Sequence, residues 1–147
     1  MKVTYIGHSA LLVETRGVRI LSDPWWRGPC FGAQWWVWPR PSLEPLEAAP
    51  VDFVYISHGH HDHLHPGTLS TLAGRPTLLV AKSLDLAAGL HQTLGLPVQE
   101  IDAEETIELA EGVTGGIWPT HGGDTLMWIT DGDQVLVSVH VKQDDKE

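Results

Sequence analysis

The sequence is poor in features that would place the protein outside the cell or in a membrane. Cys30 is the single cysteine among 147 residues, which excludes a disulfide within the chain. No run of about 18 apolar residues is present, so a membrane-spanning helix is excluded. The chain opens with Met-Lys-Val-Thr-Tyr-Ile-Gly-His, which lacks the apolar core of a signal peptide. We therefore expect a cytoplasmic protein.

Positive charge is also scarce, because 9 Lys and Arg residues face 19 Asp and Glu residues and leave a net charge of −10. Such a chain has no basic stripe with which to bind nucleic acid or an anionic membrane surface. Its apolar share of 42% and charged share of 19% are typical of a globular protein. We expect one α/β (α+β) domain over residues 1–141, incomplete at its C-terminus, and a charged tail over residues 142–147.

Short β-branched runs dominate the first part of the chain. Residues 3–6, 11–14 and 18–21 alternate with turn residues and predict an antiparallel meander. Asp23-Pro24 ends the third strand, because proline donates no hydrogen bond to a sheet. Residues 24–50 are rich in tryptophan, proline and glycine without a period, and they predict a long loop with a functional role.

A continuous apolar run over residues 53–57 predicts a strand that is covered on both faces. Ser83 is expected to cap a later amphipathic helix and Gly95 to end it. The further predicted elements are a short helix over 66–72, a strand over 77–80, the amphipathic helix over 83–94, strands over 98–101, 106–109, 113–118, 126–130 and 134–139, and a hairpin turn over 131–133.

The histidine-rich stretch over residues 58–65 is the strongest chemical signal, with five of the nine histidines and one aspartate. His58 and His60 are two residues apart just after the buried strand, so both rings leave the same side and can chelate one metal ion. Asp62 and His63 are adjacent where the chain turns, and they can bind a second ion. Imidazole with one carboxylate suits zinc best, with iron or manganese as alternatives. A histidine-rich surface turn without metal is the competing interpretation.

The pattern H-x-H-x-D-H over residues 58–63 resembles the signature of the metallo-β-lactamase superfamily. Residues 5–9 and 20–24 are similar to the G-H-[AS] and L-x-D-P elements of its ascorbate-6-phosphate lactonase-like branch. The tryptophan-rich loop and residues 63–69 resemble the CMP-N-acetylneuraminate hydroxylase-like members still more closely. The resemblance implies an αββα sandwich, of which this chain is the N-terminal portion. It also implies one or two metal ions at one edge of the sandwich and, in most members, hydrolysis.

The resemblance further implies metal ligands outside this stretch. His121 is the candidate for the third ligand of the first ion, with an ordinary turn histidine as the alternative, and Asp124 is a second candidate beside it. His8 and Asp23 end strands that the family places next to the metal, where Asp23 would orient a ligand imidazole or face the substrate with His8. A plain turn residue and a strand cap are the alternatives for these two. His140 stands where the family has a bridging aspartate, which is a departure from its pattern.

Two explanations fit the missing C-terminal ligands. The chain is either part of a longer enzyme or a short form that completes its sheet and its site as a homodimer. The tryptophans of the long loop serve either as a hydrophobic lid or substrate platform, or as core residues. Cys30 is expected to be a packed residue and not a nucleophile.

The expected activity is hydrolysis of an ester, lactone or phosphodiester in a small-molecule substrate by a metal-bound hydroxide. His58, His60 and His121 would hold the first ion, while Asp62 and His63 would hold a second. If only one ion binds, Asp62 would act as the general base. The alternatives are a non-catalytic metal-binding module and an accessory domain of a larger oxidoreductase.

Overall fold

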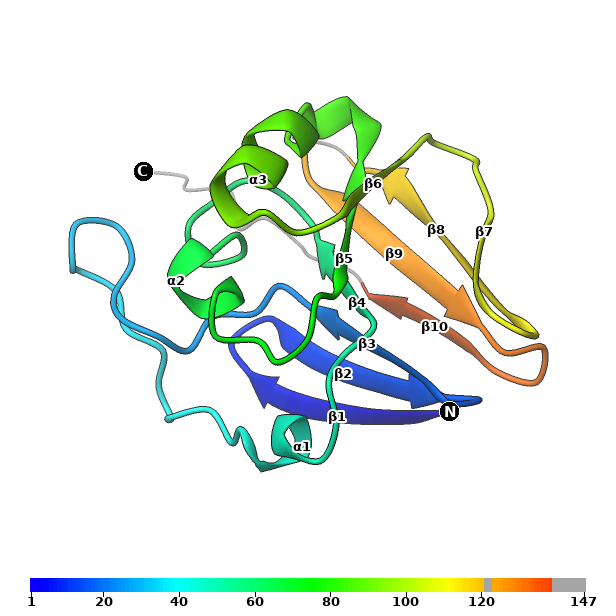
Figure 1. The fold of residues 1–147 in the computed structure, drawn as a ribbon, viewed down its shortest axis with the longest axis horizontal. Coiled ribbons are helices and arrows are strands. Elements are labelled where there is room, and N and C mark those ends of the chain that lie inside the picture. Colours follow the sequence, from blue (N-terminus) through cyan, green and yellow to red (C-terminus); the bar gives the residue numbers. More distant parts are fainter. Residues whose placement is uncertain (121–122, 139–147) are drawn as a thin grey trace.

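The computed structural model describes residues 1–120 and 123–138, which form two β-sheets packed face to face (Figure 1). The first sheet has the strand order β1-β2-β3-β4-β5-β6, and the second has the order β10-β9-β8-β7. The strands of the first sheet are β1 (Lys2–Gly7), β2 (Ala10–Thr15), β3 (Val18–Ser22), β4 (Phe53–Ile56), β5 (Thr77–Ala81) and β6 (Val98–Ile101). Those of the second are β7 (Ile107–Ala110), β8 (Val113–Pro119), β9 (Thr125–Thr130) and β10 (Val135–Ser138).

The first sheet joins an antiparallel meander to a parallel half. β1, β2 and β3 pair antiparallel, as the sequence predicts. β3, β4, β5 and β6 pair in parallel, so their carboxyl ends lie at one edge of the sheet. Parallel strands are covered on both faces, and Val54, Tyr55 and Ile56 of β4 are at most 1% exposed. The predicted metal-binding stretch begins directly after this buried strand.

The second sheet is antiparallel throughout. Along β9, buried residues alternate with half-buried ones, as expected for a sheet with one face on the core. The predicted hairpin turn between β9 and β10 is confirmed. Asp131 Oδ1 accepts hydrogen bonds from the backbone N–H groups of Asp133 and Gln134 at 3.1 and 2.8 Å, which fixes the turn.

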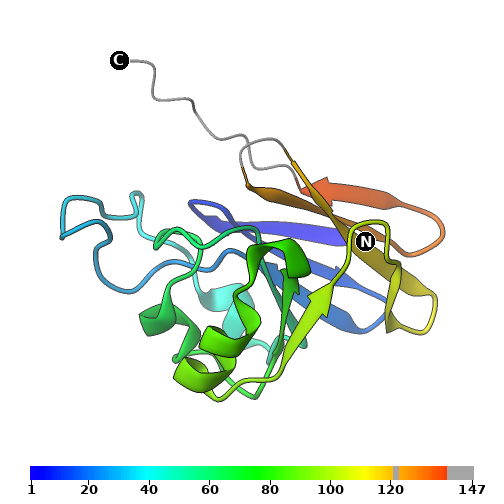
Figure 2. The ribbon, with the colours of Figure 1, turned by 90° about the horizontal axis from the view of Figure 1, so that it is seen from above.

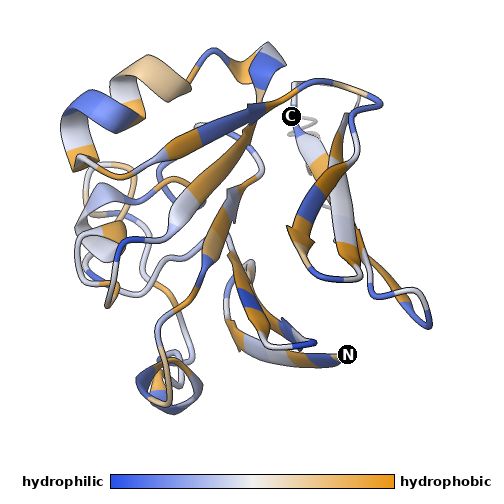
Figure 3. Cartoon of the chain, turned by 45° about the vertical axis from the view of Figure 1, so that its right-hand side comes forward, coloured by the Kyte–Doolittle hydropathy of each residue, from blue (hydrophilic) through white to orange (hydrophobic). Residues whose placement is uncertain are grey.

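Two apolar clusters lie on the two faces of the first sheet. One fills the space between the sheets, where Ile20 and Leu79 of the first sheet meet Ile117 and Ile129 of the second. The other lies under the helices and includes Leu69 and Leu90. Figure 3 shows the apolar residues that run along the strands of both sheets. The first sheet is therefore a central layer, and the loops at its ends have a rigid base.

The helices cover the outer face of the first sheet (Figure 2). They are α1 (Glu44–Glu47), α2 (Pro66–Leu69), the 3-10 turn η1 (Lys82–Leu84) and α3 (Ala87–Leu94). The helix predicted over 83–94 is wrong in its first half, because Asp85 adopts a left-handed conformation with φ of 51° and separates η1 from α3. Ser83 therefore does not cap α3, whereas Gly95 ends it as predicted, with φ of 65°. α1 was not expected within the long loop.

Several residues for which the sequence predicts a role lie outside these helices and strands. His121, His140 and the charged tail expected over residues 142–147 lie outside the described residues. Among the described residues, no helix covers the outer face of the second sheet, so the layers seen are helices, sheet and sheet. None of the helices in this part of the chain has the length and apolar character that crossing a membrane requires.

Candidate metal centre

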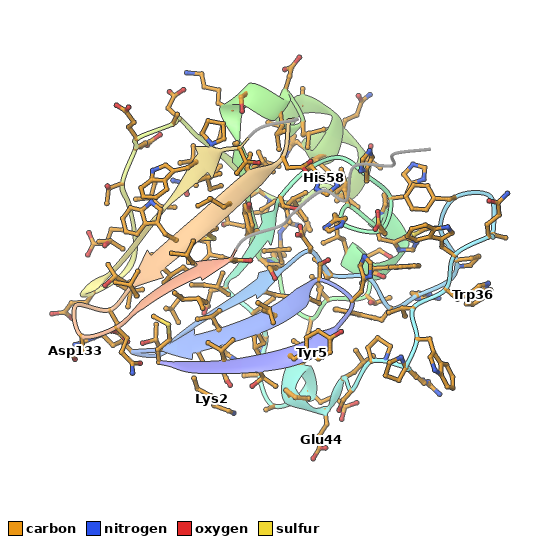
Figure 4. All side chains as sticks on the ribbon, turned by 180° about the vertical axis from the view of Figure 1, so that it is seen from behind. Lys2, Tyr5, Trp36, Glu44, His58 and Asp133 are labelled. Carbon is orange, nitrogen blue, oxygen red and sulfur yellow. The ribbon has the colours of Figure 1, made fainter. Side chains whose placement is uncertain are left out.

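The candidate site lies at the carboxyl ends of two neighbouring parallel strands. Asp23 follows β3, and Ser57 follows β4, which pairs with β3 through Ser22 and Tyr55. A backbone hydrogen bond of 2.9 Å from Asp23 N to Tyr55 O extends this pairing beyond the strands. Ligands commonly bind at such an edge, because the loops there converge while the strands beneath stay fixed. Figure 4 labels His58 in this loop, on the segment that leaves β4.

Asp23 is the anchor of the site. Its Oδ1 accepts a hydrogen bond from Ser57 N at 2.8 Å, and its Oδ2 accepts one from Ser57 Oγ at 2.7 Å. The same Oδ2 lies 3.0 Å from Nδ1 of His63. Asp23 is only 4% exposed, so three partners compensate for its burial. This arrangement holds His63 by one ring nitrogen and directs Nε2, its other nitrogen, toward Asp62.

His58 and His60 direct one nitrogen each toward the same point. Nε2 of His58 lies 2.9 Å from Nδ1 of His60, and the two rings are nearly perpendicular. Nδ1 of His58 is held 2.9 Å from Ser57 Oγ on the other side of the ring. Two nitrogens bound to a tetrahedral zinc at about 2.0–2.1 Å are about 3.3 Å apart, so a small movement of the exposed His60 would admit an ion.

A second convergence of donor atoms lies beside the first. Oδ2 of Asp62 is 2.9 Å from Nε2 of His8 and 3.4 Å from Nε2 of His63. The donor atoms of these three residues all lie within 4.8 Å of one another. The rings of His58 and His63 are 4.2 Å apart between centroids, so the two groups of donors adjoin. The described residues thus form two adjacent groups of side chains of the kinds that bind metal ions.

The electrostatics differ between the two groups. Burial, followed by the nearby charge of His63, lowers the pKa of His58 to about 4. Burial alone would lower the pKa of His63, but the hydrogen bonds and charges of Asp23 and Asp62 outweigh it and raise that pKa to about 9. Burial would raise the pKa of Asp62, yet hydrogen bonds with His63 and His8 hold it far below its usual value. At neutral pH, His58 is neutral and Asp62 is ionised, which are the forms that bind metal.

Asp124 approaches His58 from the side away from His60. Its Oδ1 lies 3.9 Å from Nδ1 of His58, the nitrogen that also faces Ser57. Oδ2 of Asp124 is buried and has no hydrogen-bond partner among the described residues. Asp124 O accepts hydrogen bonds from the backbone and side chain of Thr120, which close the turn at this position. The structure thus places Asp124 behind a predicted ligand.

The remaining histidines of the stretch have other partners. His61 is exposed, and its ring stacks on Phe31 with 6.1 Å between centroids and an angle of 25°. His65 caps α2, because its Nδ1 accepts a hydrogen bond from Thr68 N at 3.0 Å. Sequence reasoning did not foresee this cap, although the position before Pro66 in the first turn of a helix is where a cap residue stands. Sequence reasoning also did not identify Ser57 as part of the site. Its position, as a hydroxyl residue between a buried strand and the first histidine, was the available signal.

The tryptophans of the long loop divide into two kinds. Trp25 is 1% exposed and contacts His8 edge to face at 5.0 Å between ring centroids, so it is a core residue beside the site. Trp36 and Trp38 are 67% and 89% exposed, and Figure 4 shows Trp36 on a loop that projects from the body of the molecule.

Cys30 is buried, and burial followed by the charge of Asp62 raises the pKa of its thiol to about 11. A packed thiol was predicted, and the structure agrees.

A hollow of about 450 Å³ lies on another part of the surface, between the long loop and the end of α2. Trp26, Arg27, Arg40 and Leu72 are among its lining residues. No histidine of the 58–65 stretch lines it, and among the described residues Glu47 is the one carboxylate on its wall. The chemistry of the chain therefore concentrates at the histidine-rich edge and not in this hollow.

Comparison with known families agrees with this geometry. The family model described as beta-lactamase superfamily domain matches residues 2–140. This chain belongs to the metallo-β-lactamase superfamily. The resemblance predicted from the H-x-H-x-D-H pattern is confirmed, and so is the mixed α/β fold class with two sheets.

The hydroxylase-like resemblance is confirmed as well. The cytidine monophosphate-N-acetylneuraminic acid hydroxylase of Pongo pygmaeus is 40% identical over 76 residues, which cover 51% of this superfamily member and 13% of the hydroxylase. The human relative, an inactive cytidine monophosphate-N-acetylneuraminic acid hydroxylase, is also 40% identical over 76 residues, or 51% of this chain and 15% of that protein. The matched part is thus a small fraction of these relatives.

Solved structures show the same fold. CmlA, a diiron β-hydroxylase from Streptomyces venezuelae, has a TM-score of 0.71 at 24% identity, over 92% of this chain and 28% of CmlA. Igni18, a metallo hydrolase from Ignicoccus hospitalis, has a TM-score of 0.64 at 24% identity, over 92% of this chain and 58% of Igni18. The fold therefore occurs in both hydroxylases and hydrolases.

Proposed function

We propose that this metallo-β-lactamase-fold chain is a metal-dependent hydrolase that acts on an ester, lactone or phosphodiester bond of a small molecule. The observation that carries the proposal is the pair of facing nitrogens, Nε2 of His58 and Nδ1 of His60, which are 2.9 Å apart. Two imidazole nitrogens that face each other need a proton or a cation between them. A borderline-soft ion such as zinc matches these donors, and iron or manganese also accept them.

The first ion would be held by His58 and His60, with His121 as the expected third ligand. When bound, zinc with three protein ligands keeps one position for water and lowers the pKa of that water to about 7. Asp23 and Ser57 keep His58 in the tautomer that carries its proton on Nδ1, so Nε2 is the nitrogen available to an ion. Asp124, on the same side as Ser57, adds a negative charge that favours this tautomer.

The sequence allows two roles for Asp62, as a metal ligand and as a general base. We favour the ligand role, because its pKa lies far below the usual value and a carboxylate held so firmly in its ionised form is a weak base at neutral pH. Asp62 and His63 would hold a second ion next to the first. The exposed aromatic residues of the long loop would face the apolar part of a substrate, with Phe31 6.5 Å from His60 between ring centroids.

Oxidation is the second candidate function, and a specific observation favours it. The curated relatives at 40% identity are named as hydroxylases, and the fold is shared with a diiron β-hydroxylase. A site of histidines and a carboxylate accepts iron as well as zinc. In that case the chain would be an accessory or metal-binding domain of an oxidoreductase. Iron in the purified protein, together with oxygen consumption, would support this candidate over hydrolysis.

The test combines metal analysis with hydrolysis assays on the purified chain. We expect bound zinc or another transition metal and turnover of at least one ester, lactone or phosphodiester, with loss of turnover and of the first metal ion in His60→Ala. His61→Ala is the matched control, since this neighbouring ring stacks on Phe31 and does not face His58. Bound metal without turnover on any of the three substrate classes would favour the non-catalytic module. Absence of metal from the unsubstituted chain would contradict the proposal.

A further inference from the structure

The turn between β1 and β2 brings His8 to the candidate site. His8 has φ of 52°, in the left-handed region that few non-glycine residues adopt. Gly7 precedes it, and a Cβ atom added there would lie 2.8 Å from Cγ of Pro41, so the backbone passes too close to the long loop for any side chain. The turn is thus fixed by close packing, and a histidine is held in a conformation that a glycine or asparagine would adopt at lower cost.

The left-handed conformation of His8 directs its ring toward Asp62. Its Nε2 lies 2.9 Å from Oδ2 of Asp62, and the same oxygen lies 3.4 Å from Nε2 of His63. One carboxylate oxygen and two imidazole nitrogens therefore converge, with all three atoms within 4.8 Å of one another. From this geometry we infer that Nε2 of His8 is the third protein ligand of the second cation, beside Asp62 and His63. This inference rests on the proposed metal-dependent function.

A simple hydrogen bond between His8 and Asp62 is the competing explanation. It requires both rings to donate to one oxygen, and His63, whose pKa is raised to about 9, can do so in its protonated form. Nδ1 of His63 faces Oδ2 of Asp23 at 3.0 Å, which directs Nε2 at Asp62 whether that nitrogen carries a proton or binds an ion. Two ring nitrogens that converge on one carboxylate oxygen are also the donor set that a cation would use, and the cation would replace the proton on Nε2 of His63. The two explanations differ in whether His8 must supply a nitrogen ligand or only an N–H donor, which His8→Gln distinguishes.

The surroundings of His8 fit a ligand of fixed orientation. Trp25, which is 1% exposed, contacts the His8 ring edge to face at 5.0 Å between centroids, and His63 does so at 5.4 Å. The ring therefore packs between two aromatic neighbours and stays half-buried. A ligand set of two nitrogens and one oxygen suits zinc, iron or manganese. Because its members come from the β1–β2 turn and the loop after β4, the cation would also link these two segments.

The experiment is a cobalt titration of the full chain after its metal has been removed with a chelator. Visible absorption reports the number and type of ligands, and competition with a chromophoric chelator gives the dissociation constant of each equivalent. The variants are His8→Ala, which removes the nitrogen, and His8→Gln, which retains an N–H donor that can reach Asp62. His61→Ala is the control histidine. Circular dichroism of the metal-free variants establishes that each is folded.

We expect two equivalents of cobalt in the unsubstituted chain and in His61→Ala. In both His8 variants, the second equivalent should bind about 100-fold more weakly with an altered absorption spectrum, while the first is unchanged. Wild-type affinity and spectrum in His8→Gln would overturn the inference, because they would show that a hydrogen bond suffices. Cobalt binding that neither His8 variant alters would also overturn it. If the unsubstituted chain binds no cobalt, the proposed function itself fails.

Discussion

The two ends of the parallel strands both bury polar side chains, but they do so in opposite ways. At the amino end, Arg19 is 9% exposed and donates to Glu14 and to the backbone oxygens of Pro45, Ala49 and Pro50. Every contact there joins a donor to an acceptor. At the carboxyl end, nitrogens of His58 and His60 face each other, and a nitrogen of His63 faces the Asp62 carboxylate. That network gathers the imidazole and carboxylate groups that bind metal ions.

This difference distinguishes buried polar groups that stabilise the fold from buried polar groups that serve a function. A buried polar group costs free energy unless it is paired, so a network that pairs all its groups stabilises the fold by itself. A network in which metal-binding groups converge is stabilised further when a cation binds. Two of its members, His8 and Asp23, also have left-handed backbones with φ of 52° and 37°. Strain of this kind persists at functional sites, where the surrounding structure holds the residue in place.

The largest expected difference between the networks is their response to zinc. A ligand that binds only the folded state stabilises it by about 4 kcal/mol at a concentration 1,000 times its dissociation constant. We expect zinc to raise the free energy of unfolding of the chelator-treated chain by at least that amount and to stabilise the His58→Ala variant less, because this variant retains only the second group of donors. Urea unfolding with and without zinc measures both. Equal stabilisation of the two proteins would break the comparison.

Substitution of Arg19 tests the polar network at the amino end of the parallel strands. Arg19→Met leaves the carbonyl groups of Pro45, Ala49 and Pro50 and the partly exposed Glu14 without their donor, so we expect a loss of about 2 kcal/mol in the free energy of unfolding. Zinc affinity should not change, because the substitution is at the opposite end of the strands. Arg16→Met is the control, since its exposed ion pair with Asp133 is worth less than about 1 kcal/mol. A lower zinc affinity in Arg19→Met would contradict the account.

Asp23→Asn tests the residue that holds the polar network at the carboxyl end of the parallel strands together. The carboxylate oxygens of Asp23 receive hydrogen bonds from Ser57 and His63, and an amide nitrogen in place of either oxygen would face a donor. We expect zinc affinity to fall by about 10- to 100-fold. Asp52→Asn is the matched control, because Asp52 accepts from Arg19 N at 2.8 Å at the other end of the strands. The affinities come from competition with a chelator, and an unchanged value in Asp23→Asn would remove Asp23 from the site.

The smallest effect is expected at Trp38, which belongs to neither network and is 89% exposed. Trp38→Ala should change the free energy of unfolding by less than about 0.5 kcal/mol and leave zinc affinity as it is. If the loop contacts the substrate, the Michaelis constant of this variant will rise. A large loss of stability would instead mean that the loop is part of the core.

The sequence was sufficient for the pattern of strands and for the metal-binding stretch. Alternation and β-branched runs located β1 to β10, and the two-residue spacing of His58 and His60 predicted that their nitrogens converge. The sequence predicted a helix that Ser83 would cap, but α3 begins at Ala87, because the left-handed Asp85 interrupts a segment whose apolar period alone looks continuous. The approach of His8 to Asp62 joins residues 54 positions apart, and no local pattern encodes such a contact.

Anomalous X-ray scattering from a crystal of the chain with zinc added is the most direct test of the central claim. The account predicts a zinc peak bonded to Nε2 of His58 and Nδ1 of His60, and a second peak bonded to Oδ2 of Asp62 and Nε2 of His63. Density that shows the rings of His58 and His60 turned apart, with no zinc between them, would contradict it.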